Sequence, residues 1–164
     1  MSDSRDITVD PGVADARGAT EARWTRATEG LARIGTAVGA QRAEIYARSD
    51  DSVRLTSWWA ALGHEVEPPD AQRPVDPDWF PWTLGNIRQA RHVFVRNAGP
   101  LPLRPDHEHR IRDLGMGSAL YLPVLDGIGC VGALCVYWVL ERDEWPSEQA
   151  GHLTELARDV LLSA

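Results

Sequence analysis

The chain has 164 residues, 43% of them hydrophobic, and a formal net charge of −7. This length is typical of one domain that buries enough apolar surface to fold without disulfides or structural metals. Every basic residue is an arginine, and the acidic excess leaves no basic face for a phosphate backbone, which argues against direct nucleic-acid binding. No signal-type or membrane-spanning apolar run occurs outside one glycine-punctuated stretch, so a cytoplasmic location without membrane contact is expected.

The N-terminal region divides into two parts. Residues 1–17 are polar and lack periodicity, which predicts a mobile tail ahead of a single domain over residues 18–164. Apolar residues then recur at steps of three and four between Trp24 and Val38. This spacing predicts a helix over residues 20–38 that buries one stripe.

The middle of the chain predicts short elements. Runs that alternate between apolar and polar residues, as strands do, cover residues 42–48, 53–59 and 92–96. Proline-rich and acidic residues make an irregular excursion over residues 60–78. Helical segments are predicted up to about residue 90 and over residues 105–114 and 147–163.

The stretch from Leu114 to Leu140 consists of two long apolar runs joined at Asp126 and Gly127. Its β-branched and aromatic residues favour strands, and an Asp-Gly pair can adopt the positive φ angles of a tight hairpin. We therefore expect a hairpin at the centre of a sheet that is covered on both faces. Cys130 and Cys135 lie an odd number of positions apart in its second arm, which on a regular strand predicts opposite faces and no disulfide between them.

Strand alternation sorts the hairpin into two faces. The plainer, helix-packing face is predicted to carry Leu120, Leu122, Leu134, Val136 and Trp138. The face with polar groups is predicted to carry Ala119, Tyr121, Ala133, Cys135 and Tyr137.

These motifs carry a family resemblance. The run from Leu114 to Val124, the Asp-Gly hinge, the Gly132 to Val136 run and the Trp145-Pro-Ser-Glu-Gln segment together resemble a GAF domain. The pairing of Phe80-Pro81-Trp82 with a later Leu101-Pro102 is similar to a bacterial signalling subgroup of that family. The resemblance implies an α+β sandwich with a central antiparallel sheet of five or six strands. It also implies terminal helices on one face, often paired with a second subunit, and helices and loops that form a ligand pocket on the other.

The resemblance also suggests where a ligand would bind. Aromatic rings, an imidazole, hydroxyl groups and a thiol would suit a small planar or aromatic molecule better than a polyphosphate. The candidate ligand-binding residues are Trp79, Trp82, His92, Phe94, Tyr121, Cys135 and Tyr137. The same side chains could instead complete an ordinary core. Haem or another non-covalent tetrapyrrole stays open as a ligand, with His92 as the candidate iron ligand.

No catalytic residue, metal site or required cofactor is predicted. Free methionine sulfoxide reductases, which are GAF enzymes, would by resemblance place pocket acids at Ala119, Cys135 and Tyr137, and none of these is an acid. Bilin-binding relatives would place their attaching cysteine at Leu103, although Pro105 and His107 fit their pattern.

The expected function is therefore that of a non-enzymatic sensory domain of bacterial signal transduction. It would act as a homodimer that signals through its terminal helices, with a partner signalling protein. A ligand-free dimerisation or interaction scaffold is the alternative, and an enzyme like methionine sulfoxide reductase is a further one.

Overall fold

Five strands form one antiparallel sheet in the order β2-β1-β5-β4-β3. The structure, a computed structural model, describes residues 11–49, 52–66, 74–75, 81–98, 112 and 114–163, and within these it omits the side chains of residues 11–18, 20, 81, 82 and 163. The strands are β1 (Arg42–Ser49), β2 (Ser52–Ala60), β3 (Val93–Val95), β4 (Ser118–Leu125) and β5 (Cys130–Trp138).

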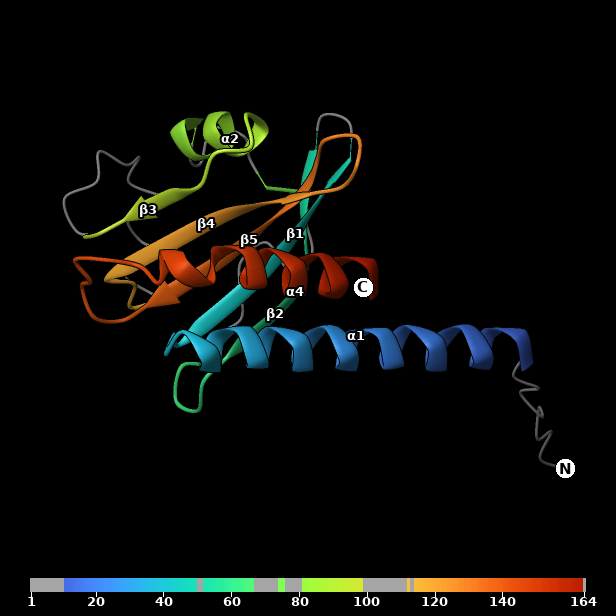
Figure 1. The fold of residues 1–164 in the computed structure, drawn as a ribbon. Helices are drawn as coiled ribbons and strands as arrows, with labels where there is room; N and C mark the ends of the chain where they lie inside the picture. The colour runs from blue at the N-terminus through green and yellow to red at the C-terminus, as the bar shows by residue number, and fades with distance from the viewer. Residues whose placement is uncertain are drawn as a thin grey trace, which may run out of the picture.

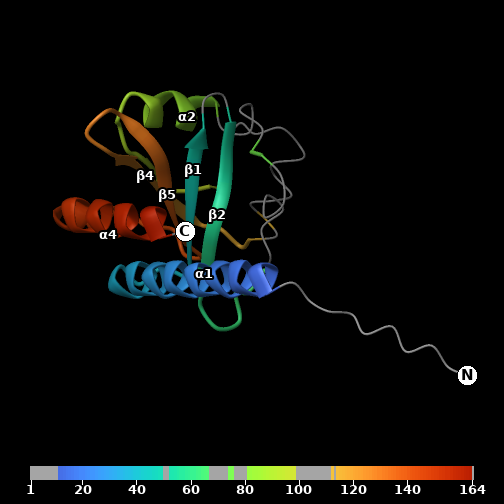
Figure 2. The same ribbon diagram turned by 90° about the vertical axis from the view of Figure 1, so that its right-hand side faces the viewer.

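Helices cover both faces of this sheet. The terminal helices α1 (Pro11–Ala37) and α4 (Ala150–Ser163) lie on one face, and the short helix α2 (Pro81–Arg88) lies on the other (Figures 1 and 2). This arrangement confirms the predicted α+β sandwich. Within the described part of the chain, no helix has the length and apolar character needed to cross a membrane.

The first helix is longer than its periodicity predicted. It begins at Pro11, inside the segment that was expected to be a tail, because a proline in the first turn and the alanine-rich sequence that follows both suit a helix. Residues 1–10 and most of the helix predicted over residues 105–114 lie outside the described residues.

The face toward α1 and α4 is almost wholly apolar. Leu31 and Ile34 of α1 and Leu153 of α4 are fully buried against the sheet. A glycine allows the close approach of the two helices, since a Cβ at Gly30 would lie 2.4 Å from Cγ2 of Val160. The predicted helix-packing set is confirmed on this face: Leu120, Leu122, Leu134, Val136 and Trp138.

The opposite face holds a second cluster that includes tyrosines and a thiol. The predicted polar-face set is confirmed here, with Ala119, Tyr121, Cys135 and Tyr137 buried and Ala133 packed against them. Ile87 of α2 belongs to the same cluster. We call this side the tyrosine face, and its described members also include Tyr46, Val95, Ala98 and Met116.

The central hairpin is present, but its turn differs from the prediction. Gly127 is not among the residues with positive φ. Instead, residues 126–129 form a longer loop in which one carboxylate oxygen of Asp126 accepts hydrogen bonds from the backbone N–H groups of Ile128 (2.8 Å) and Gly129 (2.7 Å). These bonds lower the pKa of Asp126, because they favour the charged carboxylate.

Regular alternation predicted that the two cysteines lie on opposite faces of the sheet. In the structure they lie on the same face. A bulge shifts the pairing of β4 with β5 between Val124 and Leu125, so the alternation changes near the start of β5. Cys130 and Cys135 therefore both contact the tyrosine face, and both are free thiols.

Candidate functional site

A buried ion pair lies on the tyrosine face of β1. Nε of Arg42 donates to Oε1 of Glu44 at 2.6 Å, and the two residues are 3% and 0% exposed. Strand alternation places both side chains on this face, because the residue between them, Ala43, packs toward the helices. A charged pair is thus held inside a sheet that is covered on both sides.

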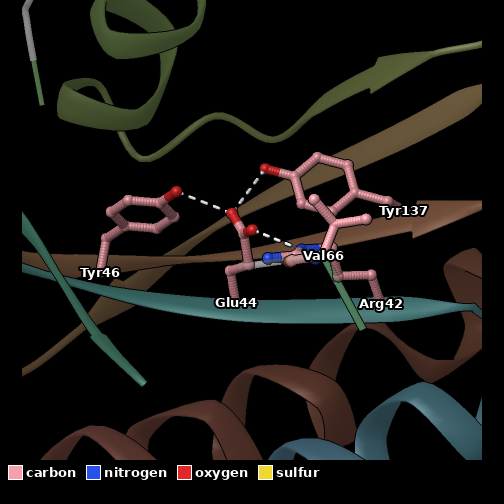
Figure 3. Close-up of polar contacts among 5 residues, drawn as sticks. All are labelled: Arg42, Glu44, Tyr46, Val66 and Tyr137. Carbon is pink, nitrogen blue, oxygen red and sulfur yellow. Dashed lines mark hydrogen bonds and ion pairs between the residues drawn. The ribbon is translucent and has the colours of Figure 1, made fainter. Parts of the chain in front are cut away.

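Two tyrosines complete the surroundings of the Glu44 carboxylate. Tyr46 OH and Tyr137 OH both donate to Oε2, at 2.7 Å and 3.0 Å (Figure 3). Tyr137 comes from β5, where it pairs in register with Arg42. Burial and the nearby Glu44 charge raise the pKa of Tyr137 well above its ordinary value, so this hydroxyl remains a donor at neutral pH.

The Arg42 guanidinium is fixed on three sides. Besides its bond to Glu44, Nη1 donates to the carbonyl of Val66 at 2.6 Å, and the group lies 4.8 Å from the centre of the Trp58 ring. Its remaining nitrogen, Nη2, is buried and has no hydrogen-bond partner in the described structure. A buried donor without an acceptor costs about 1–3 kcal/mol.

Three of the predicted ligand-binding residues come together on this face. Tyr121 pairs in register with Cys135, and the rings of Tyr121 and Tyr137 meet edge to face at 6.1 Å. Their hydroxyl groups and thiol lie in the same buried layer as Tyr46. This grouping is the one that strand alternation predicted.

Two other predicted residues lie elsewhere, so the expectation that they converge with the tyrosines is wrong. In β3 it is Val93 that pairs with Tyr121 and packs on the tyrosine face, which turns its neighbours the other way. Phe94 meets Trp138 edge to face at 6.4 Å, on the helix side of the sheet. His92 is exposed and lies against Trp145, with ring centres 4.9 Å apart and planes tilted by 53°, so it does not line the tyrosine face as an iron ligand would have to.

The two predicted tryptophans are not placed by the structure. Trp79 lies outside the described residues, and Trp82 belongs to α2 by its backbone while its side chain is not described. Leu103 and His107, which were compared with bilin-binding relatives, also lie outside them. Among the described residues, no group of three or more His, Cys, Asp and Glu could hold a metal ion.

Sequence reasoning missed Arg42, Glu44 and Tyr46. Their alternation with Ala43 and Ile45 reads as the solvent side of a half-buried strand. The local sequence does not reveal where β1 lies in the sheet. In the structure β1 lies between β2 and β5, and α2 lies on the side of the sheet to which these three side chains point. Charged residues on an interior strand of a doubly covered sheet must be buried, and therefore paired.

The same strand also connects this face to the terminal helices. Trp138 follows Tyr137 on β5, points to the opposite face and is 1% exposed. Its Nε1 donates to the carbonyl of Val38, just after the end of α1, at 3.1 Å. Trp138 therefore connects β5 directly to the end of α1.

Comparison with known proteins identifies the fold. A sequence model described as the GAF domain matches residues 25–163. The chain belongs to the GAF domain family. No curated protein matches this GAF domain in sequence.

Solved structures agree with this GAF assignment. The blue-light absorbing form of the PixJ GAF domain from Thermosynechococcus elongatus superposes with a TM-score of 0.66 at 19% identity, covering 88% of this chain and 86% of that one. A GAF domain/HD domain protein from Geobacter sulfurreducens gives 0.64 at 16% identity, covering 82% and 86%. A domain of a putative two-component sensor histidine kinase protein from Sinorhizobium meliloti 1021 gives 0.59 at 19% identity, covering 94% and 92%. At these identities the similarity establishes the fold alone.

Proposed function

We propose that this GAF domain is a sensory domain of bacterial signal transduction that binds a small planar or aromatic molecule against its tyrosine face. The observation that carries the proposal is the buried cluster of Arg42, Glu44, Tyr46 and Tyr137. The helix-facing side of the same sheet is packed almost wholly with apolar side chains. A concentration of directional polar groups on one face is what a ligand-binding layer requires.

A ligand-free scaffold would gain little from this chemistry. Buried ion pairs seldom stabilise a fold more than apolar residues of equal volume, and an unpartnered buried donor lowers stability. Both features are present at Arg42. A ligand that offers an acceptor would offset this cost, which favours a binding role over a purely structural one.

We also propose that the domain is not an enzyme. Glu44 is the buried carboxylate of the described tyrosine face, and three donors already engage it. A carboxylate whose two oxygens are already engaged by these donors is poorly placed to accept a proton from a substrate. The group is better suited to orient Tyr137 and Arg42 than to perform chemistry.

The proposed output runs through the terminal helices, in a cytoplasmic homodimer that acts on a partner signalling protein. Leu31, Val38, Leu153 and Val160 of these helices are buried within the chain itself, so they are not free to form a subunit interface. The dimer is supported by Trp24, which is 47% exposed on α1. In addition, α1 extends beyond α4 (Figure 1), as expected for helices of 27 and 14 residues.

Native mass spectrometry of the purified protein tests the binding role and the subunit state together. We expect the mass of a dimer, and a co-purified or added aromatic molecule that dissociates on collisional activation in the instrument. The Tyr121→Phe variant, which loses one hydroxyl group, should fold normally and retain less ligand. A monomer mass at tens of micromolar would refute the dimer, and equal ligand retention by Tyr121→Phe would refute a role for its hydroxyl. A structure with a fully packed tyrosine face would favour the scaffold.

A further inference from the structure

Two buried polar atoms in the described structure have no hydrogen-bond partner: Nη2 of Arg42 and Oγ1 of Thr83. The residues are 3% and 5% exposed. They come from different elements, since Arg42 lies at the start of β1 and Thr83 lies in α2. Buried polar groups in native proteins nearly always have partners, so two orphans in one small domain require an explanation.

Both orphans border the same layer. Thr83 is one helical turn before Ile87 and shares its face of α2. Ile87 packs into the cluster of the tyrosine face, so this side of α2 points toward the sheet. Arg42 lies on that side of the sheet, and Figure 3 shows α2 on the same side as the Arg42 and Glu44 side chains. One unsatisfied group thus borders the layer from β1, and the other borders it from α2, which packs over β3, β4 and β5.

The charge of this layer limits what can complete it. The buried charged residues of the described structure are Arg42 and Glu44, which neutralise each other. An anionic ligand would therefore add an uncompensated buried charge, whereas a neutral acceptor would satisfy Nη2 without one. The donor is also preorganised, because Glu44, Val66 and Trp58 hold the guanidinium in place.

We propose that the ligand is an uncharged planar molecule whose carbonyl oxygen accepts from Nη2 of Arg42 and whose second polar group meets the hydroxyl of Thr83. This inference rests on the proposed ligand-binding function and specifies its chemical class. The tyrosine rings would supply the flat apolar contact, and the two orphan atoms would supply orientation.

Three probes of similar size test the proposal by NMR titration of the full chain. They are 4-quinolone, which is neutral and carries a carbonyl; quinoline-4-carboxylate, which is anionic; and naphthalene, which has no acceptor. We expect 4-quinolone to bind at least tenfold more tightly than the other two, with shifts at Ile87 and Tyr121. Equal affinity for naphthalene, or tighter binding of the carboxylate, would overturn the inference but leave a binding site in place. Absence of binding by all three would overturn the proposed function itself.

Two variants assign the contacts. Thr83→Val replaces the hydroxyl by a methyl group of similar size, so it should raise the urea midpoint of the free protein, because a buried orphan is lost, and weaken 4-quinolone binding severalfold. Arg42→Lys keeps the charge opposite Glu44 but removes Nη2, and should abolish the preference for 4-quinolone over naphthalene. The control is Thr154→Val on α4, whose hydroxyl already donates to the carbonyl of Ala150 at 2.9 Å, and it should leave binding unchanged. Unchanged affinity in both Thr83→Val and Arg42→Lys would overturn the proposal.

Discussion

Tyr137 and Trp138 are adjacent on β5, and their side chains form hydrogen bonds on opposite faces of the sheet. The Tyr137 hydroxyl donates to Glu44 on the tyrosine face, and the Trp138 indole donates to the carbonyl of Val38 beside the end of α1. The backbone between them also joins β1, since the carbonyl of Tyr137 accepts from the N–H of Gln41 at 3.0 Å. The contact with Glu44 on the tyrosine face and the contact with the end of α1 are therefore one peptide unit apart.

Replacing Trp138 by phenylalanine should weaken the connection to α1. The substitution removes the donor to the Val38 carbonyl and leaves space beneath Arg142, whose guanidinium lies 4.9 Å from the Trp138 ring centre. We expect the free energy of unfolding in urea to fall by about 1–3 kcal/mol. Trp24→Phe, at a residue that is 47% exposed, is the matched control and should change it by less than about 0.5 kcal/mol. Equal effects of the two variants would show that the Trp138 contact is energetically unimportant.

Replacing Glu44 by glutamine should be strongly destabilising. The variant leaves the Arg42 charge buried without its counter-ion and alters the acceptor for two tyrosine hydroxyls. Removal of one partner from a buried pair typically costs about 3–5 kcal/mol, which urea denaturation would measure. Glu155→Gln, on the exposed side of α4, controls for the loss of a negative charge. A Glu44→Gln variant as stable as this control would contradict the buried ion pair.

Tyr137 should make the fold sensitive to alkali. Its pKa in the folded state is raised, so folding favours the neutral hydroxyl. The stability that depends on this hydroxyl is then complete below the ordinary tyrosine pKa of about 10 and is lost as the pH rises above it. Urea unfolding measured across this range should show a falling free energy, and Tyr137→Phe should flatten the fall. An equally steep decline in the variant would assign the effect to other groups.

Gly132 should not tolerate a side chain. A Cβ built there would lie 2.2 Å from the backbone carbonyl oxygen of Tyr46, so β1 and β5 would have to separate. We expect Gly132→Ala to destabilise the domain by about 1–3 kcal/mol or more, measured as the free energy of unfolding in urea. Gly151→Ala is the control, because that position in α4 has open space and should gain about 0.5–1 kcal/mol. Similar values for both variants would contradict the close packing of the strands.

Much of the fold could be predicted because local periodicity and global burial agree. The apolar stripe of α1 and the long hairpin of β4 and β5 both carry unambiguous patterns, and alternation alone placed Tyr121, Cys135 and Tyr137 on one face. Alternation failed where the backbone is irregular. The bulge near Leu125 reversed the face of Cys130, and the loop at Asp126 is closed by a backbone bond from Asp126 N–H to the Gly129 carbonyl together with bonds to the Asp126 side chain.

The candidate site was harder to predict because it depends on strand order. Glu44 and Arg42 look like solvent-facing residues until β1 is known to lie inside the sheet. Conversely, Phe94 looks like a site residue until the register of β3 places Val93, and not Phe94, opposite Tyr121 on the tyrosine face. Long-range pairing fixes both, and no local pattern encodes it.

The most direct test of the central claim is the indole N–H resonance of Trp138, followed by NMR while 4-quinolone saturates the tyrosine face. Because this N–H donates to the Val38 carbonyl at 3.1 Å, a ligand that shifts Tyr137 should also shift this resonance and the backbone amides at the end of α1. We expect these changes to follow the same binding curve as those of Tyr121. If 4-quinolone saturated the tyrosine face while the resonances of Trp138 and α1 stayed unchanged, the proposed coupling would be contradicted.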